Sequence, residues 1–171
     1  MHSIPKNVET VIQSTLPILD RVERYRYMDR CMVISRGFNY ATAFETALKV
    51  KELTRVVAEP YSSADFRHGP IATVERGFPV FLIAASGAVY EDLEELSHHL
   101  DDLGAEKITV SDDTNFLNSA KLKLSIPTGI PEWLSPIVAI IPSQLFAMQL
   151  AIEKGLNVDK PEGLTKVTQT I

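Results

Sequence analysis

The stretch Cys31-Met32-Val33-Ile34-Ser35-Arg36-Gly37 is a short apolar run that ends in a glycine turn. The segment from Ala41 to Thr54 follows closely and carries apolar residues at helical spacing. A strand, a glycine turn and a helix in this order form the repeating unit of α/β domains. These residues therefore predict a buried strand that leads directly into a helix.

The same alternation of strand and helix patterns continues along the chain. Further strands are expected at 56–58, 80–84, 108–110 and 122–126, with a polar loop between the last two. Helices are expected at 3–24, 62–67, 90–103 and 135–155, the last with Ser135 as its capping residue before Pro136. Apolar strands separated by helices favour a parallel sheet covered on both faces. The pattern predicts an α/β fold, a three-layer sandwich around a five-stranded parallel sheet.

Length and composition exclude several classes of protein. The chain has 171 residues, 45% hydrophobic and 23% charged, which fits one globular domain over 1–155 followed by a tail over 156–171. A net charge of -5 argues against binding to nucleic acid or to an anionic membrane, and the longest apolar run, 137–141, is far shorter than the ~20 residues of a spanning helix. The single cysteine, Cys31, excludes an internal disulfide, so we expect a cytoplasmic protein.

The predicted helix from Ala41 to Thr54 carries a polar stripe. On a helical wheel, Glu45, Lys49 and Glu52 fall within about 60° of one another, between two apolar arcs. This pattern fits a helix packed on two sides with polar residues between. It also fits a solvated ion pair at i,i+4 with a spare glutamate, and spacing alone favours that simpler interpretation.

Two loops carry residues suited to proton transfer or anion binding. His68 precedes Gly69-Pro70, so its imidazole lies on a stiff loop, where a histidine either moves protons at neutral pH or is merely a surface residue. Ser86-Gly87 resembles a small-residue turn that binds phosphate through backbone N–H groups. Cations that could neutralise an anionic substrate are Arg36, Lys49, Arg55, Arg67 and Lys166. Dinucleotide, nucleotide triphosphate, hydrolase and metal-binding motifs are absent from the sequence, so we expect neither a metal nor another cofactor.

Several motifs taken together resemble a known family. They are Ser35-Arg36-Gly37, residues 43–52 (AFETALKVKE), Ala58-Glu59-Pro60, Arg67-His68-Gly69-Pro70 and the ending Val158-Asp159-Lys160-Pro161 with Leu164-Thr165-Lys166. In this order they resemble the second sugar isomerase (SIS) domain of the glucosamine-6-phosphate synthase (glutamine–fructose-6-phosphate aminotransferase) family. The resemblance covers essentially the whole chain and implies a flavodoxin-like five-stranded α/β domain that acts on hexose 6-phosphates.

The resemblance also implies roles for individual residues. Glu52 matches the base that moves a proton between C1 and C2, and His68 matches a histidine that assists ring opening and can come from a neighbouring subunit. Glu45 and Lys49 match the first glutamate and the lysine of the helix motif, and Lys166 matches a tail lysine that engages the open-chain carbonyl. We expect further substrate contacts from Arg36, Gly37, Ser86 and Thr165.

The family's glutaminase domain and its first SIS domain have no counterpart in these residues, and the first SIS domain is the one that holds most of the sugar phosphate. We therefore expect a companion SIS domain and a homodimer, with the tail over 156–171 completing the active site. Isomerases, deaminases and deglycases built from two SIS domains share the same residues, so the exact reaction stays open. The alternatives to an enzyme are a non-catalytic module that binds sugar phosphates and a domain that only dimerises.

Overall fold

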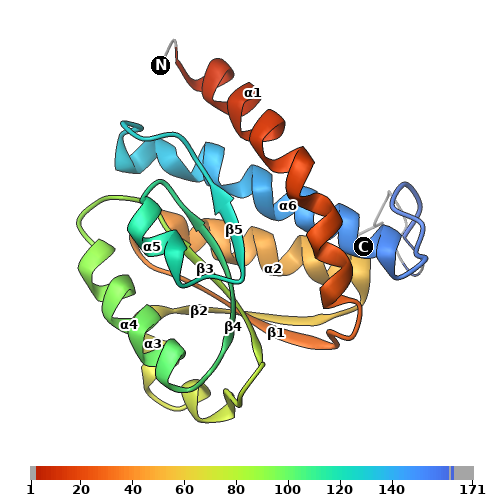
Figure 1. Cartoon of the computed structure of the whole chain (residues 1–171), viewed down its shortest axis with the longest axis horizontal. Helices are drawn as coiled ribbons and strands as arrows, with labels where there is room; N and C mark the ends of the chain where they lie inside the picture. Colours follow the sequence, from red (N-terminus) through yellow and green to blue (C-terminus); the bar gives the residue numbers. More distant parts are fainter. Residues whose placement is uncertain (1–2, 162, 164–171) are drawn as a thin grey trace, which may run out of the picture.

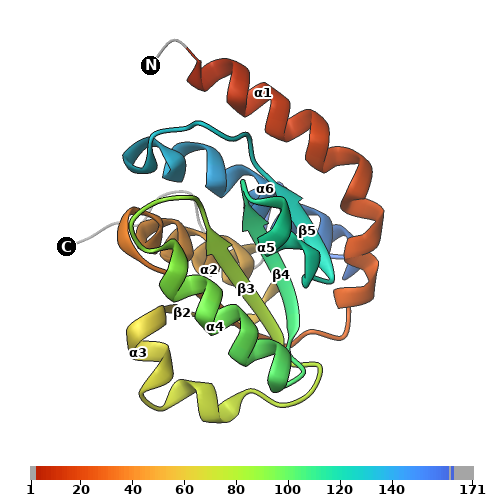
Figure 2. The same ribbon diagram turned by 60° about the vertical axis from the view of Figure 1, so that its left-hand side comes forward.

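The computed structural model describes residues 3–161 and residue 163, and it forms a five-stranded sheet between two layers of helices (Figures 1 and 2). The strands are β1 (Arg30–Ser35), β2 (Val57–Ser62), β3 (Pro79–Ala84), β4 (Glu106–Ser111) and β5 (Leu122–Ser125). They pair in parallel in the order β2-β1-β3-β4-β5. The predicted three-layer α/β fold is confirmed.

The helices cover the two faces of the sheet unequally. One face carries α1 (Ile4–Thr15), the 3-10 helix η1 (Leu16–Tyr25), α2 (Tyr40–Thr54) and α6 (Ser135–Glu153). The other carries α3 (Ser63–Arg67), α4 (Tyr90–Asp102) and α5 (Thr114–Asn118), and the short 3-10 helices are η2 (Gly37–Asn39), η3 (Pro70–Thr73) and η4 (Glu132–Leu134). Val33 and Ile34 of β1 lie in opposite core clusters, because successive side chains of a strand alternate between the faces. The continuous apolar run of the first strand follows from this burial on both faces.

Two predicted elements have different bounds in the structure. The single helix expected over 3–24 changes from α-helix to 3-10 helix at Leu16, because Pro17 cannot donate a backbone hydrogen bond. The strand expected over 56–58 runs from Val57 to Ser62 and includes Pro60. Proline is tolerated there because β2 is an edge strand of the sheet.

Two polar segments were also predicted wrongly. The loop between β4 and β5 contains α5, whose first turn is capped by the carboxylate of Asp113. Ser135 is not the capping residue of the last helix: Leu134 occupies that position, and the Ser135 hydroxyl donates to the carbonyl of Glu132 at 2.7 Å. The same hydroxyl accepts a hydrogen bond from the side-chain amide of Asn39, also at 2.7 Å.

That last hydrogen bond joins the start of α6 to the start of α2. The two helices lie against each other and run in the same direction (Figure 1).

The segment Glu132–Glu153 is long and apolar enough to cross a membrane. The short apolar runs in the sequence did not predict a segment of this kind. Half of it is buried inside the fold, where it serves as a core helix.

Candidate active site

The predicted stripe of α2 forms a connected cluster of charged side chains. Nζ of Lys49 donates to Oε2 of Glu52 at 2.7 Å and lies 3.6 Å from Oε1 of Glu45. The three side chains are between 30% and 41% exposed, so solvent or a ligand reaches all of them. The structure thus brings together three of the predicted site residues, which we call the Lys49 cluster.

The charges of the Lys49 cluster suit proton transfer. The hydrogen bond to Glu52 raises the pKa of Lys49, burial opposes this shift, and the Glu45 carboxylate adds to it. Lys49 is therefore cationic at neutral pH, and its ammonium fixes the orientation of the Glu52 carboxylate. A positioned carboxylate of this kind can act as a general base.

Exposed apolar side chains border the Lys49 cluster on one side. Phe44 is 52% and Leu48 42% exposed, although both are large and apolar. A groove of about 610 Å³ is lined by Ala41, Phe44, Glu45, Leu48, Lys51 and Pro60. Within one chain, the expectation that α2 packs on both sides of the stripe is therefore wrong for this side, because its apolar arc faces solvent.

His68 lies far from Glu52 within one chain. It follows α3 at the carboxyl end of β2 and is exposed, and the next residue, Gly69, has a φ of 142°. Glu52 lies in the last turn of α2, which runs back toward the amino ends of the strands. Figure 1 shows α3 and the end of α2 on opposite sides of the molecule. A single chain does not bring the predicted base and the predicted histidine together.

The predicted tail residues Thr165 and Lys166 lie outside the described residues. The part of the tail that is described begins after α6, whose last turn is held by Lys154: its amine donates to the carbonyls of Arg26 and Met28 at 2.9 and 2.7 Å. Because α6 and α2 run in the same direction, the tail begins at the same end of the sheet as Glu52 (Figure 1).

Two of the predicted cations converge on one carboxylate. Arg36, which follows β1, and Arg67 of α3 both contact Oδ1 of Asp92, at 3.0 and 2.8 Å. Gly37, beside Arg36, has a φ of 63°, a left-handed conformation that favours glycine. Asp92 was not predicted from the sequence, because its place in the first turn of a helix suggests no more than a favourable interaction with the helix dipole.

The turn after β3 is filled by carboxylates. The N–H of Ser86 donates to Asp112 at 2.7 Å, and the N–H of Ala88 donates to Glu132 at 3.1 Å. The Glu132 side chain lies so close to Gly87 that a Cβ atom there would be 2.3 Å from its Cδ. The predicted phosphate-binding turn thus has an anionic partner from the protein itself, which sequence spacing could not reveal.

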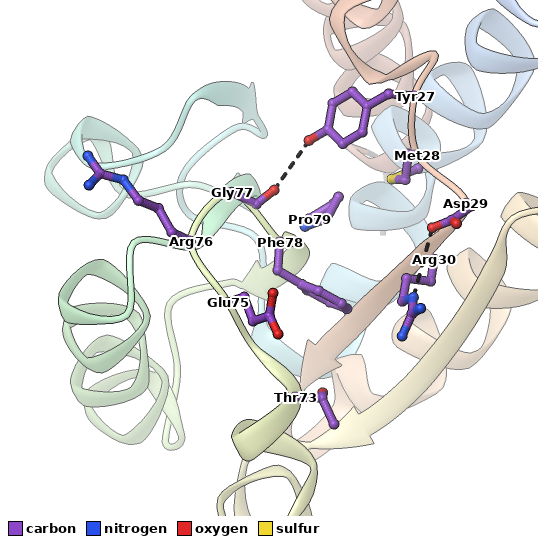
Figure 3. A pocket seen from close by; sticks show the side chains of 10 residues that line it. All are labelled: Tyr27, Met28, Asp29, Arg30, Thr73, Glu75, Arg76, Gly77, Phe78 and Pro79. Atoms are coloured by element: carbon purple, nitrogen blue, oxygen red, sulfur yellow. Dashed lines mark hydrogen bonds and ion pairs between the residues drawn. The ribbon is translucent and has the colours of Figure 1, made fainter.

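A separate cleft lies at the other end of the strands. It has a volume of about 320 Å³ and is lined by residues that precede β1 and β3, with Phe78 pointing into it and Arg76 turned away (Figure 3). This cleft is at the amino ends of the strands, and none of the predicted site residues lines it. Within residues 3–161, no group of three or more His, Cys, Asp or Glu side chains is arranged to hold a metal ion.

Comparisons with known proteins agree with this architecture. The glutamine–fructose-6-phosphate aminotransferase (isomerizing) of Pyrococcus horikoshii is 36% identical over 168 residues, covering 96% of this chain and 28% of that protein. The corresponding protein of Bacteroides thetaiotaomicron is 30% identical over 171 residues, covering 97% and 27%. The chain therefore spans little more than a quarter of the length of these relatives.

Solved structures give the same result. The C-terminal domain of glucosamine-fructose-6-phosphate aminotransferase from Francisella tularensis matches with a TM-score of 0.84 and 25% identity, covering 93% of this chain and 45% of that one. Tagatose-6-phosphate ketose/aldose isomerase from Escherichia coli shares the fold, with a TM-score of 0.81 at 21% identity, covering 98% and 47%. Residues 26–154 match the family described as SIS domain. This match spans most of the chain, and the chain accordingly belongs to the SIS domain family.

Proposed function

We propose that the chain is the isomerase domain of a phosphosugar enzyme, an aminotransferase, isomerase or deaminase acting on hexose 6-phosphates such as fructose 6-phosphate and glucosamine 6-phosphate. The Lys49 cluster carries this proposal, because it holds the Glu52 carboxylate 2.7 Å from an ammonium, and its third member, Glu45, lines an open groove. The substrate class is supported by the relatives' names, a fructose-6-phosphate aminotransferase and a tagatose-6-phosphate isomerase.

The reaction we propose is a proton transfer between C1 and C2. Glu52 accepts the proton from one carbon and returns it to the other, while Lys49 and Glu45 keep its carboxylate in place. The enediol-like intermediate carries negative charge on oxygen, and the cation of Lys166, with Thr165 beside it, engages the open-chain carbonyl. The tail over 156–171 thus completes the active site, which is consistent with its start at the same end of the sheet as the last turn of α2.

We further propose that the active site is shared between two chains of a homodimer. Within one folded chain, Glu52 and His68 lie toward opposite ends of the strands. The histidine that opens the sugar ring therefore comes from the second chain. The exposed Phe44 and Leu48 beside the Lys49 cluster are suited to burial in such an interface. In this arrangement each dimer has two equivalent sites.

The sugar phosphate is held mainly by a companion SIS domain in this proposal. Arg36, Gly37 and Ser86 lie with His68 at the carboxyl ends of the strands, so they add contacts from the chain that supplies His68; the backbone N–H of Ser86 is already paired with Asp112 there. This pairing disfavours a module that only senses sugar phosphates. The exposed Phe44 favours a second candidate, a domain that only dimerises, which needs no base. We place the protein in the cytoplasm, in line with its relatives among metabolic enzymes.

Titration calorimetry tests the substrate class. We expect the chain to bind fructose 6-phosphate weakly and fructose not at all, because only the phosphate offers a charge to Arg36, whose side chain stays 42% exposed although it contacts Asp92. Equal heats for the two sugars would contradict the proposal.

Light scattering tests the shared site. We expect a mass twice that of the 19.0 kDa chain at micromolar concentration. A monomer at every concentration would contradict a site built from two chains.

A further inference from the structure

The loop that carries His68 follows the short helix α3, which has five residues (Ser63–Arg67). A helix of this length is not stable by itself, because one turn does not offset the cost of nucleation. Contacts with the rest of the fold must therefore hold it. Phe66 is fully buried on one side, and Arg67 makes the polar contacts next to His68.

Those polar contacts meet at Asp92 in the first turn of α4. Oδ1 of Asp92 accepts from Arg67 at 2.8 Å, its backbone carbonyl accepts from the same guanidinium at 2.7 Å, and its other carboxylate oxygen accepts from the hydroxyl of Ser63. Arg36, from the loop after β1, contacts Oδ1 at 3.0 Å. One carboxylate thus joins three separate segments, and we call Arg36, Ser63, Arg67 and Asp92 the Asp92 clamp.

We propose that Asp92 is a positioning residue for His68. By binding Ser63 and Arg67 it fixes the first and the last residue of α3, and through Arg36 it fixes that helix relative to the loop after β1. The catalytic consequence rests on the proposed function, in which His68 opens the sugar ring. The mechanical part, that the clamp holds residues 63–69 in place, is independent of that function.

The clamp is intact at physiological pH. Burial raises the pKa of Asp92, but the hydrogen bonds from Ser63 and Arg36 and the charge of Arg67 outweigh this effect and bring it below its ordinary value. Asp92→Asn removes the charge at almost unchanged volume. A matched control is Glu95→Gln, one turn further along α4, whose 84% exposed carboxylate lies 3.9 Å from the same arginine.

Backbone hydrogen exchange measured on the 171-residue chain tests the mechanical part. In Asp92→Asn we expect the amides of residues 63–69 to exchange about tenfold faster, with those of α2 unchanged, since one charged hydrogen-bond network is lost locally. Glu95→Gln should leave both regions as in the wild type. Unchanged exchange at 63–69 in Asp92→Asn would overturn the proposal. If that variant does not fold, Arg67→Lys is measured in its place, because it keeps the charge but loses the two-pronged contact with Oδ1 and the backbone carbonyl of Asp92.

The catalytic part of the proposal is tested with two sugars in the full-length protein, by which we mean this chain together with its proposed companion SIS domain. Fructose 6-phosphate must open its ring, whereas 5-deoxyfructose 6-phosphate lacks the hydroxyl that closes it. We expect Asp92→Asn to slow proton exchange at C1 of fructose 6-phosphate about 10- to 100-fold through kcat and to leave the acyclic analogue within about twofold of the wild type. Equal losses on both sugars would show a general structural effect and overturn the positioning role. Absence of exchange in the wild-type protein would contradict the proposed function, while hydrogen exchange would still decide whether Asp92 holds the loop.

Discussion

Lys49 and Lys107 form ion pairs of the same length in two different surroundings. Each amine lies 2.7 Å from a carboxylate, that of Glu52 for Lys49 and that of Asp101 for Lys107. The Lys49 side chain is 32% exposed, whereas that of Lys107 on β4 is 1% exposed. Lys107 also donates to the carbonyl and hydroxyl of Ser97 and to the hydroxyl of Ser119, at 3.1, 2.8 and 2.6 Å.

The pKa values of the two lysines shift in opposite directions. The hydrogen bond to Glu52 raises that of Lys49, whereas burial lowers that of Lys107 despite the opposing effect of Asp101. The three N–H groups of Lys107 have four acceptors within the protein, so none is left for a substrate. The distance of an ion pair therefore does not separate a structural pair from a functional one. The two lysines differ in the solvent exposure of the side chain and in the number of hydrogen bonds that the amine makes within the protein.

The largest expected effect comes from removing the carboxylate partners. Glu52→Gln in the full-length protein should slow exchange of the sugar's C1 or C2 proton with deuterated water by about 100- to 10,000-fold, because it removes the base and keeps the shape. Asp101→Asn breaks an ion pair of the same length and should leave the rate per folded molecule unchanged. Full exchange in Glu52→Gln would make Glu52 part of a structural ion pair, and Glu45 and Glu59 would be the next candidates.

The free energy of unfolding should respond in the opposite order, with the larger loss at the Lys107 pair. Lys107→Ala should lower the free energy of unfolding by about 3 kcal/mol, since it leaves a cavity and unsatisfied hydroxyls, whereas Lys49→Ala should lower it by about 0.5 kcal/mol or less. Urea titration measures both, with labelling of Cys31 as a second probe. Burial raises the pKa of the Cys31 thiol to about 12, so it reacts when the core opens. Equal losses for the two variants would contradict the distinction.

The smallest expected effect is a change in the stability contributed by each lysine as the solution becomes alkaline. Because the folded pKa of Lys49 is raised, its contribution to stability is complete below the unfolded pKa and is lost as pH rises through the folded pKa. The folded pKa of Lys107 is lowered, so its unfavourable charge is relieved and its contribution grows as pH rises toward about 10.5. The stability difference between wild type and Lys49→Met should therefore shrink with alkaline pH, and that between wild type and Lys107→Met should grow. Parallel trends would be inconsistent with the opposite pKa shifts.

Much of the fold was predictable because its signals are local. The glycine turn after Cys31–Ser35 and the helical spacing over 41–54 predicted β1 and α2 to within about a residue. β2 was predicted too short, because whether a strand tolerates Pro60 depends on its place at the sheet edge, and strand order is not written in local sequence.

The site was predictable only where its residues share one element. Glu45, Lys49 and Glu52 lie on one helix, so their spacing predicted their contact. Asp92 and the carboxylates of Asp112 and Glu132 act on segments 25 or more residues away, which no spacing rule connects. The positions of Thr165 and Lys166 fall outside the described residues, so their roles stay predictions.

The proposed active site combines Glu52 of one chain with His68 of another, and subunit mixing tests this arrangement most directly. Full-length Glu52→Gln and His68→Ala proteins, each inactive in proton exchange, are unfolded together and refolded so that mixed dimers form. Half of the dimers then contain one chain of each kind, and each mixed dimer has one intact site, so we predict about a quarter of the wild-type rate. No recovery of exchange, with mixed dimers demonstrated by mass spectrometry, would contradict the claim.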